Sequence, residues 1–238
     1  MGENEAAGPG GFFTLRTTAP VPDGGHLTLA RLYAGQDAPL TARIDTVAER
    51  LGTSERRVAA SVAHLGLAAR LWSTALGQAA LTGGFPALRA EDLHWDPRLS
   101  APDDLWLDGG AMLPGSASRI RDAVQCGHLE PLCAAIRRDT PVPVRLLWGN
   151  AGSALAGAVR QLVVWARTHR RPDVAARTRA LAAELFDHAD LRGTGAPHGP
   201  GFRRRTCCLY YRVPGGGLCG DCVFDEAPRR PPGRPGPD

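Results

Sequence analysis

Apolar residues recur at helical spacing along much of the chain. One such face comprises Leu40, Ile44, Val47, Ala48 and Leu51. This spacing predicts a helix that ends before Gly52, because glycine suits the residue just past a helix end. Apolar positions from Val58 to Trp72 predict a second helix, with Ser54 as its N-terminal cap.

The second half of the chain predicts further helices. Ser116 or Ser118 is suited to begin one, and Pro131 is expected to interrupt it. Pro143 fits the first turn of a long helix with apolar positions along its whole length. A last helix is predicted over residues 174–188. The glycines expected to let another helix approach the long one closely are Gly149, Gly152 and Gly157.

Shorter apolar pieces lie between these helices. Residues 93–95 and 105–107 predict two short strands or extended loops, and residues 12–17 could form another strand. The pattern predicts a mainly α fold, with a helical body, a few short strands and a small cysteine-rich element near the C-terminus. We expect a flexible tail over residues 1–11, the body over 12–192, a linker (193–201) and the cysteine element within 193–227, and a disordered Pro/Gly/Arg tail over 228–238.

Composition and charge narrow the function classes. Every one of the 28 basic residues is arginine, and the formal net charge is only +4. Nucleic-acid-binding proteins usually concentrate basic residues on one face, whereas the dense cluster here is limited to Arg203–Arg205, so no nucleic-acid partner is expected. No apolar run is long enough for a membrane span, and the acidic N-terminus lacks an apolar signal core. We therefore expect a cytoplasmic protein.

Four of the six cysteines lie near the C-terminus, as Cys207-Cys208-x10-Cys219-x-x-Cys222. In a reducing cytosol such a group is more often a metal or catalytic site than a disulfide framework. Four thiolates suit both Zn²⁺ and iron–sulfur clusters. Zinc sites usually present two separated Cys-x-x-Cys pairs, and neighbouring side chains on an extended backbone point to opposite sides. A [2Fe–2S] rhomb is larger than one ion and strains adjacent cysteines less, although this geometry leaves zinc open.

Other polar and sulfur-containing residues could support such a site. The candidates for balancing the negative charge of a cluster are Arg204, Arg205 and Arg212, each of which is also typical of a solvated surface. Buried structural roles are expected for Cys126 and Cys133, rather than a second metal site with His128. His198 is expected to be exposed. No Ser/His/Asp or Cys/His set suggests covalent catalysis, so no catalytic residue is expected beyond the metal centre.

The cysteine spacing and its surroundings carry a family resemblance. The segment RRRTCCLYYRVPGGGLCGDC resembles the C-terminal signature of the FhuF-like ferric-siderophore reductases, in particular of actinobacterial members. Two segments of the body, Glu55–Gly77 and Arg145–Ala158, also resemble segments of this family. The resemblance extends over most of residues 12–224.

The resemblance implies a [2Fe–2S] cluster on Cys207, Cys208, Cys219 and Cys222. It implies a reductase that passes one electron to Fe(III) in an imported siderophore, typically a hydroxamate, and releases Fe(II). No nucleotide-binding glycine motif is present, so the electron donor is expected to be external, such as a ferredoxin or a flavin reductase. The alternatives are a regulatory or interaction module that binds zinc through the four cysteines, and an iron–sulfur sensor without turnover.

Overall fold

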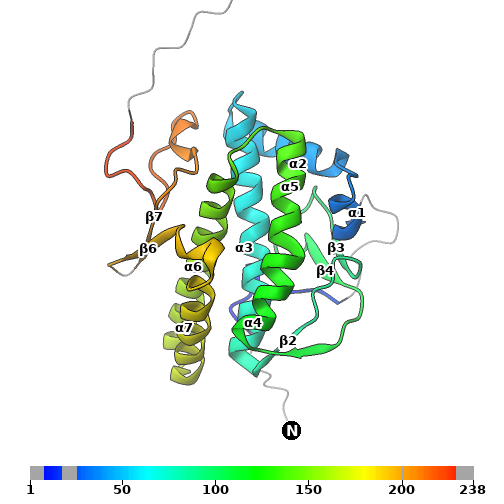
Figure 1. The fold of residues 1–238 in the computed structure, drawn as a ribbon, viewed down its shortest axis with the longest axis vertical. Coiled ribbons are helices and arrows are strands. Elements are labelled where there is room, and N and C mark those ends of the chain that lie inside the picture. The colour runs from blue at the N-terminus through cyan, green and yellow to red at the C-terminus, as the bar shows by residue number, and fades with distance from the viewer. Residues whose placement is uncertain (1–7, 18–25, 200, 229–238) are drawn as a thin grey trace, which may run out of the picture.

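The computed structural model describes residues 8–17, 26–199 and 201–228 (Figure 1). Most of the described chain is helical, as predicted. The two tails expected over residues 1–11 and 228–238 lie mainly outside the described residues. Within the described part, no helix is both long enough and apolar enough to cross a membrane.

Helix α3 (Arg56–Thr82) lies at the centre of the body (Figure 1). Small and apolar residues surround it on most sides, and Leu71, Trp72 and Leu76 are fully buried. Its helical neighbours are α2 (Ala38–Leu51), α6 (Val144–Thr168) and α7 (Pro172–Phe186). A helix that is buried almost all round anchors the elements on every side of it, so α3 fixes the positions of α2, α6 and α7.

The boundaries of the first helices agree with prediction in part. Gly52 follows α2 in the left-handed conformation, with φ of 58°, as its position predicted. Ser54 does not cap α3, because the helix begins after Glu55 and the nearby side-chain bond is from the Glu55 N–H to Thr53. The helix also continues beyond Trp72 as far as Thr82.

Small antiparallel sheets lie around the helices. They comprise β1 (Leu27–Thr28), β3 (Leu93–Trp95) and β4 (Leu105–Leu107) in one sheet, β2 (Gly84–Pro86) with β5 (Met112–Pro114), and β6 (Gly195–His198) with β7 (Gly201–Arg204). The strands predicted at 93–95 and 105–107 are therefore confirmed. The strand predicted over residues 12–17 is wrong: a short 3₁₀ turn, η1 (Gly11–Phe13), begins there, and Arg16 alone bridges to Trp106. Strand β6 occupies much of the stretch expected to be a linker.

The interruption predicted at Pro131 is absent, because helical structure continues through it. The segments are α4 (Ala117–Ile120), the π-helical η2 (Arg121–Leu129) and α5 (Glu130–Asp139). Ser116 caps the start, as its hydroxyl accepts from the Arg119 N–H at 3.3 Å. The wider π turns end with a bond from the Glu130 N–H to the Gln125 carbonyl, so Pro131 falls in the first turn of α5, where its missing N–H is tolerated.

The remaining short helices are α1 (Leu29–Tyr33), α8 (Ala189–Arg192) and η3 (Tyr210–Arg212). The C-terminal element that follows β7 lies beside one end of α6 and α3 (Figure 1). The helical body therefore supports the cysteine-rich segment directly.

Candidate metal centre

The four cysteines of the C-terminal element come together in space. The thiol of Cys208 is hydrogen bonded to those of Cys207 and Cys219, and Cys222 is close enough to act electrostatically on Cys207 and Cys219. None of the four forms a disulfide. Leu209 has a φ of 69° directly after the adjacent pair, so the chain turns sharply there. With this turn, the Cys207–Cys208 pair lies close to the Cys219–Cys222 pair.

Each of the four sulfurs is approached by the backbone N–H two residues further along the chain. The pairs are Leu209 to Cys207 (3.2 Å), Tyr210 to Cys208, Asp221 to Cys219, and Phe224 to Cys222 (3.5 Å). An N–H donor stabilises negative charge on sulfur and therefore favours the thiolate, which is the form that binds metals. The repeated pattern prepares all four sulfurs for the same role.

Of these thiols, the one that loses its proton most easily is Cys208, which is hydrogen bonded to two others. Hydrogen bonds from Cys207 and then Cys219 hold the pKa of Cys208 well below its ordinary value, and the Tyr210 N–H and the Arg204 guanidinium act in the same direction. The pKa values of Cys207 and Cys219 are raised, first because each is hydrogen bonded to Cys208 and then because of burial. A bound cation would favour the thiolate at every position, since metal binding releases protons from thiols.

Arg204 lies buried beside the cysteine pair, with 2% of its surface exposed. Its Nη2 donates to Oδ1 of Asn150 at 2.6 Å, and its Nε donates to the Thr206 carbonyl at 3.0 Å. Its Nη1 has no hydrogen-bond partner within residues 8–17, 26–199 and 201–228. A buried cation with an unused donor next to Cys208 suits a negatively charged group. The four sulfurs, their N–H donors and this cation together fit an anionic iron–sulfur cluster.

The other candidate arginines lie differently. Arg205 is exposed, and Arg212 donates to the Glu55 carboxylate at 2.9 Å. Arg203 forms an ion pair with Asp225 at 2.8 Å. Of the arginines near the cysteines, Arg204 is thus the one that lies buried against them, a distinction that the run of three arginines in the sequence does not reveal.

A buried polar network connects the cysteines to the central helices. Asn150 on α6 donates to the Ser61 carbonyl on α3 at 2.8 Å, and the Ser61 hydroxyl donates to the Cys208 carbonyl at 2.8 Å. Arg204 joins the network through its bond to Asn150. Sequence reasoning identified neither Ser61 nor Asn150 as part of the site. A polar position on an otherwise apolar helix face was the signal in both cases.

Asp221, within the Cys219-x-x-Cys222 turn, attaches this turn to α6. Its carboxylate accepts from the Ser153 hydroxyl at 2.5 Å and pairs with Arg160 at 3.4 Å, while its backbone carbonyl accepts from the Arg204 N–H at 3.0 Å. The carboxylate is largely buried. No local sequence signal identifies these contacts, because the partners are far away along the chain.

Gly149 and Gly152 of α6 leave room for the residues on either side of the β6–β7 hairpin, whereas the sequence predicted room for another helix. A Cβ at Gly149 would overlap Oγ1 of Thr206, and a Cβ at Gly152 would overlap Oγ1 of Thr194. The close neighbours are thus segments adjoining the β6–β7 hairpin and not another helix. At Gly157 a Cβ would meet only Nη2 of Arg160, at 3.9 Å.

The remaining cysteines and histidines lie elsewhere. Cys133 is buried, with its Sγ 3.5 Å from Nε2 of His64, and burial raises its pKa to about 12. His128 lies between the Tyr33 hydroxyl and the Leu88 carbonyl. Cys126 is half-buried and His198 is exposed on β6. Among the described residues, the four clustered cysteines included, no three Cys, His, Asp or Glu side chains are arranged to hold a single metal ion, whereas a [2Fe–2S] cluster takes two ligands at each of its two irons.

Comparison with known families agrees with this arrangement. Residues 55–194 match the family described as ferric iron reductase FhuF-like transporter, and residues 204–224 match the FhuF 2Fe-2S C-terminal domain. No curated protein and no solved structure matches the chain significantly. The first match spans the central helices and the second spans all four clustered cysteines. Since the first covers more than half of the sequence, the chain belongs to the FhuF-like ferric iron reductase family and carries that family's 2Fe-2S domain.

Proposed function

We propose that Cys207, Cys208, Cys219 and Cys222 hold the [2Fe–2S] cluster and that the protein reduces Fe(III) in an imported siderophore. The observation that carries the ligand assignment is the gathering of four free thiols, each with a backbone N–H donor. The substrate class follows from the family, together with the resemblance to reductases of hydroxamate siderophores. The proposed location is the cytoplasm, where imported ferric siderophores would arrive.

The chemistry of the substrate explains why a single electron is enough. Hydroxamate oxygens are hard donors that hold Fe(III) tightly and the larger, less charged Fe(II) weakly. When bound, the [2Fe–2S] cluster supplies one electron at a time, which matches the conversion of Fe(III) to Fe(II). The chelate then opens without any covalent bond being made or broken by the protein.

The chain's own residues set the electrostatics of this step. The buried Arg204 and the four backbone N–H donors stabilise negative charge at the sulfurs, which favours acceptance of an electron at the site. Cys208 is buried, whereas Cys207, Cys219 and Cys222 are half-buried, so one side of the site is accessible. The electron would come from an external donor such as a ferredoxin or a flavin reductase.

The test combines cysteine substitution with turnover. Replacing each of the four cysteines singly by serine should abolish both the visible absorption of the cluster and reduction of a ferric hydroxamate, whereas Cys126→Ser should retain both. A ferrous chelator captures the Fe(II) that is released. Its amount is then compared with the amount of cluster that has been reoxidised. If Cys207→Ser kept a full cluster, the ligand assignment would be wrong. If the cluster were intact but reduced protein formed no Fe(II), the protein would be a sensor. Colourless protein containing one zinc would support the zinc alternative.

A further inference from the structure

A groove lies on the side of α6 and α7 that faces the β6–β7 hairpin. Its volume is about 640 Å³, within the usual range for small-molecule sites. Much of the wall is apolar, with Val159, Val163 and Val164 from α6 facing Phe186 of α7 and Phe202 of β7. Val164 is 53% exposed, which is unusual for a large apolar side chain. The apolar wall is therefore open to a ligand.

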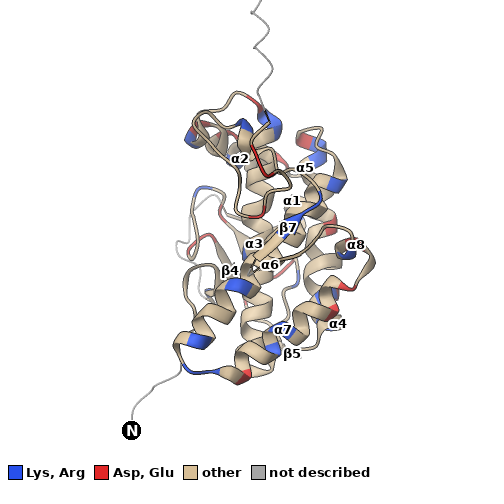
Figure 2. Cartoon of the chain, turned by 90° about the vertical axis from the view of Figure 1, so that its left-hand side faces the viewer, with Lys and Arg blue, Asp and Glu red and all other residues tan. Residues whose placement is uncertain are grey.

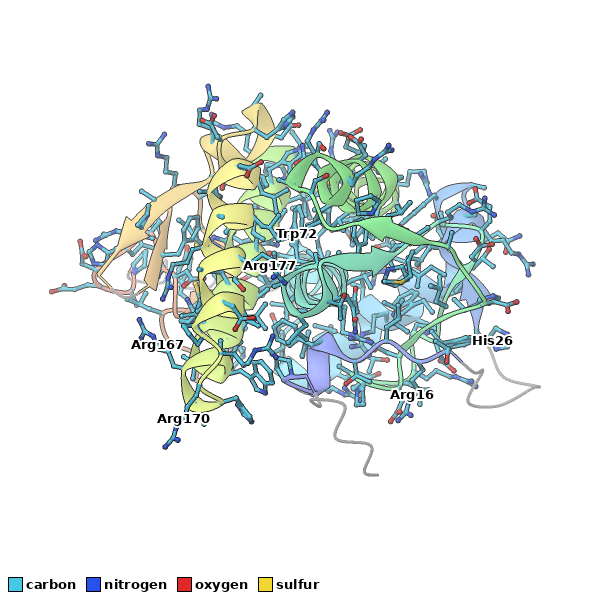
Figure 3. All side chains as sticks on the ribbon, turned by 90° about the horizontal axis from the view of Figure 1, so that it is seen from below. Arg16, His26, Trp72, Arg167, Arg170 and Arg177 are labelled. Atoms are coloured by element: carbon cyan, nitrogen blue, oxygen red, sulfur yellow. The ribbon has the colours of Figure 1, made fainter. Side chains whose placement is uncertain are left out.

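The charged residues around this groove are all arginines. They are Arg160, Arg167, Arg179 and Arg192, and none of the described residues that line the groove is an Asp or a Glu. Arg192 pairs with Asp187 and Arg160 with Asp221. The side chains of Arg167 and Arg179 make no ion pair or hydrogen bond with any described residue. Arg167 projects outward beside α6, whereas Arg177 lies toward α3 (Figure 3).

Basic positions also continue along α6 and around its turn into α7 (Figure 2). The groove thus combines an apolar floor with two cations that have no partner in the described part of the chain. Charge complementarity selects an anionic ligand, because a cationic ligand would meet Arg167 and Arg179, whose charges no carboxylate among the described residues offsets.

The groove is connected to the cysteine element by a direct contact. Arg160 lines the groove, and its Nη1 lies 3.4 Å from the carboxylate of Asp221, between Cys219 and Cys222. Phe202, on the opposite wall, belongs to the strand that leads into the cysteine pair. A ligand in the groove would therefore lie against Arg160, whose partner Asp221 belongs to the turn between Cys219 and Cys222.

We propose that this groove binds the ferric chelate and selects hydroxamate chelates that carry a free carboxylate. The methylene spacers of a linear hydroxamate would pack on the valines, and the carboxylate would pair with Arg167 and Arg179. This inference rests on the proposed function, since it names the substrate class of the same reductase. It adds a location and a charge preference that the cysteines alone do not determine.

The test uses one linear tris-hydroxamate whose terminal amine is left free, acetylated or succinylated. The resulting chelates are cationic, neutral and anionic, while the iron environment stays the same. Gallium(III) chelates bind without being reduced, so calorimetry measures affinity independently of turnover. We expect the anionic chelate to bind best and this preference to weaken with salt. Arg167→Gln and Arg179→Gln should each reduce affinity for the anionic chelate by about 1.5- to 5-fold, the range for exposed charge pairs.

The control is Arg137→Gln, which removes an exposed arginine from α5, outside the groove wall. It should leave the charge preference unchanged. Equal binding of the three gallium chelates, or unchanged affinities in the double variant of Arg167 and Arg179, would overturn the groove assignment even if ferric chelates were reduced. Charge-dependent gallium binding without any cluster reoxidation by the ferric chelates would instead contradict the reductase proposal and leave the groove assignment standing.

Discussion

Gly149→Ala tests whether the cysteine element depends on its close approach to α6. The new Cβ would overlap Oγ1 of Thr206 and lie 3.1 Å from Nη2 of Arg204. Overpacking of this kind destabilises a protein by about 1–3 kcal/mol. Gly157→Ala is the matched control, because it is the same substitution in the same helix and its Cβ would have ordinary space. Both alanines gain about 1 kcal/mol of helix propensity, so the difference between the variants isolates the steric effect.

Thermal unfolding of the cluster-loaded proteins, followed by far-UV circular dichroism, measures this difference. We expect Gly149→Ala to unfold about 2–12 °C below Gly157→Ala, since 1 kcal/mol shifts the midpoint by about 2–4 °C at this chain length. Gly149→Ala should also lose its visible absorption faster when a chelator is added. Adding Thr206→Ala to Gly149→Ala should restore part of the stability. If Gly149→Ala matched Gly157→Ala in midpoint and in cluster retention, the close approach would not be a constraint on the fold.

Two further predictions concern charge. Arg204→Gln should lower the reduction potential of the cluster by on the order of 100 mV, the effect on a one-electron step of one charge about 7 Å away at an effective dielectric constant of about 20. A redox titration measures this shift, and the exposed Arg205→Gln should change the potential less. Burial lowers the pKa of His64 to about 3, with Arg204 adding to the effect, and burial lowers that of His128 to about 4. Because the unfolded chain takes up these protons first, stability should fall as pH drops from about 6.5 toward 3. Across this pH range, the free energy of unfolding measured in urea should decline less steeply for His64→Gln than for the unsubstituted protein. An equally steep decline would contradict the assignment of this pH dependence to His64.

The helices were predictable where local sequence alone determines them. The apolar spacing that ends at Leu51 and the glycine after it predicted α2 and its last residue, because both signals act within a few residues. The adjacent cysteine pair and the Cys-x-x-Cys turn likewise pointed to the four thiols that the structure brings together. In each case the informative residues are neighbours in the sequence.

The features that were missed depend on distant or unusual backbone geometry. Pro131 does not end its helix because the preceding π turns shift the hydrogen-bond register, which no apolar pattern reports. Asp221 looks like an exposed turn residue, yet Ser153 and Arg160 bury its carboxylate from α6. Gly149 was expected to admit a helix and instead admits Thr206. The Asp221 and Gly149 cases concern which element is the partner, whereas the Pro131 case concerns whether a helix continues.

The contacts of the cysteine element suggest that it does not act as an independent unit. Much of its attachment is polar: Arg204 bonds Asn150, Asp221 bonds Ser153, and the Cys208 carbonyl accepts from Ser61. A short segment with few buried apolar side chains has little hydrophobic stabilisation of its own, so these bonds to α3 and α6 hold the sulfurs in place. Since each bond ends on a helix of the body, a shift of α6 would move both Asp221 and Arg204 relative to the sulfurs. Groove and cluster would then be coupled through the same helix, because α6 supplies the groove wall with Arg160 and the cluster support with Asn150.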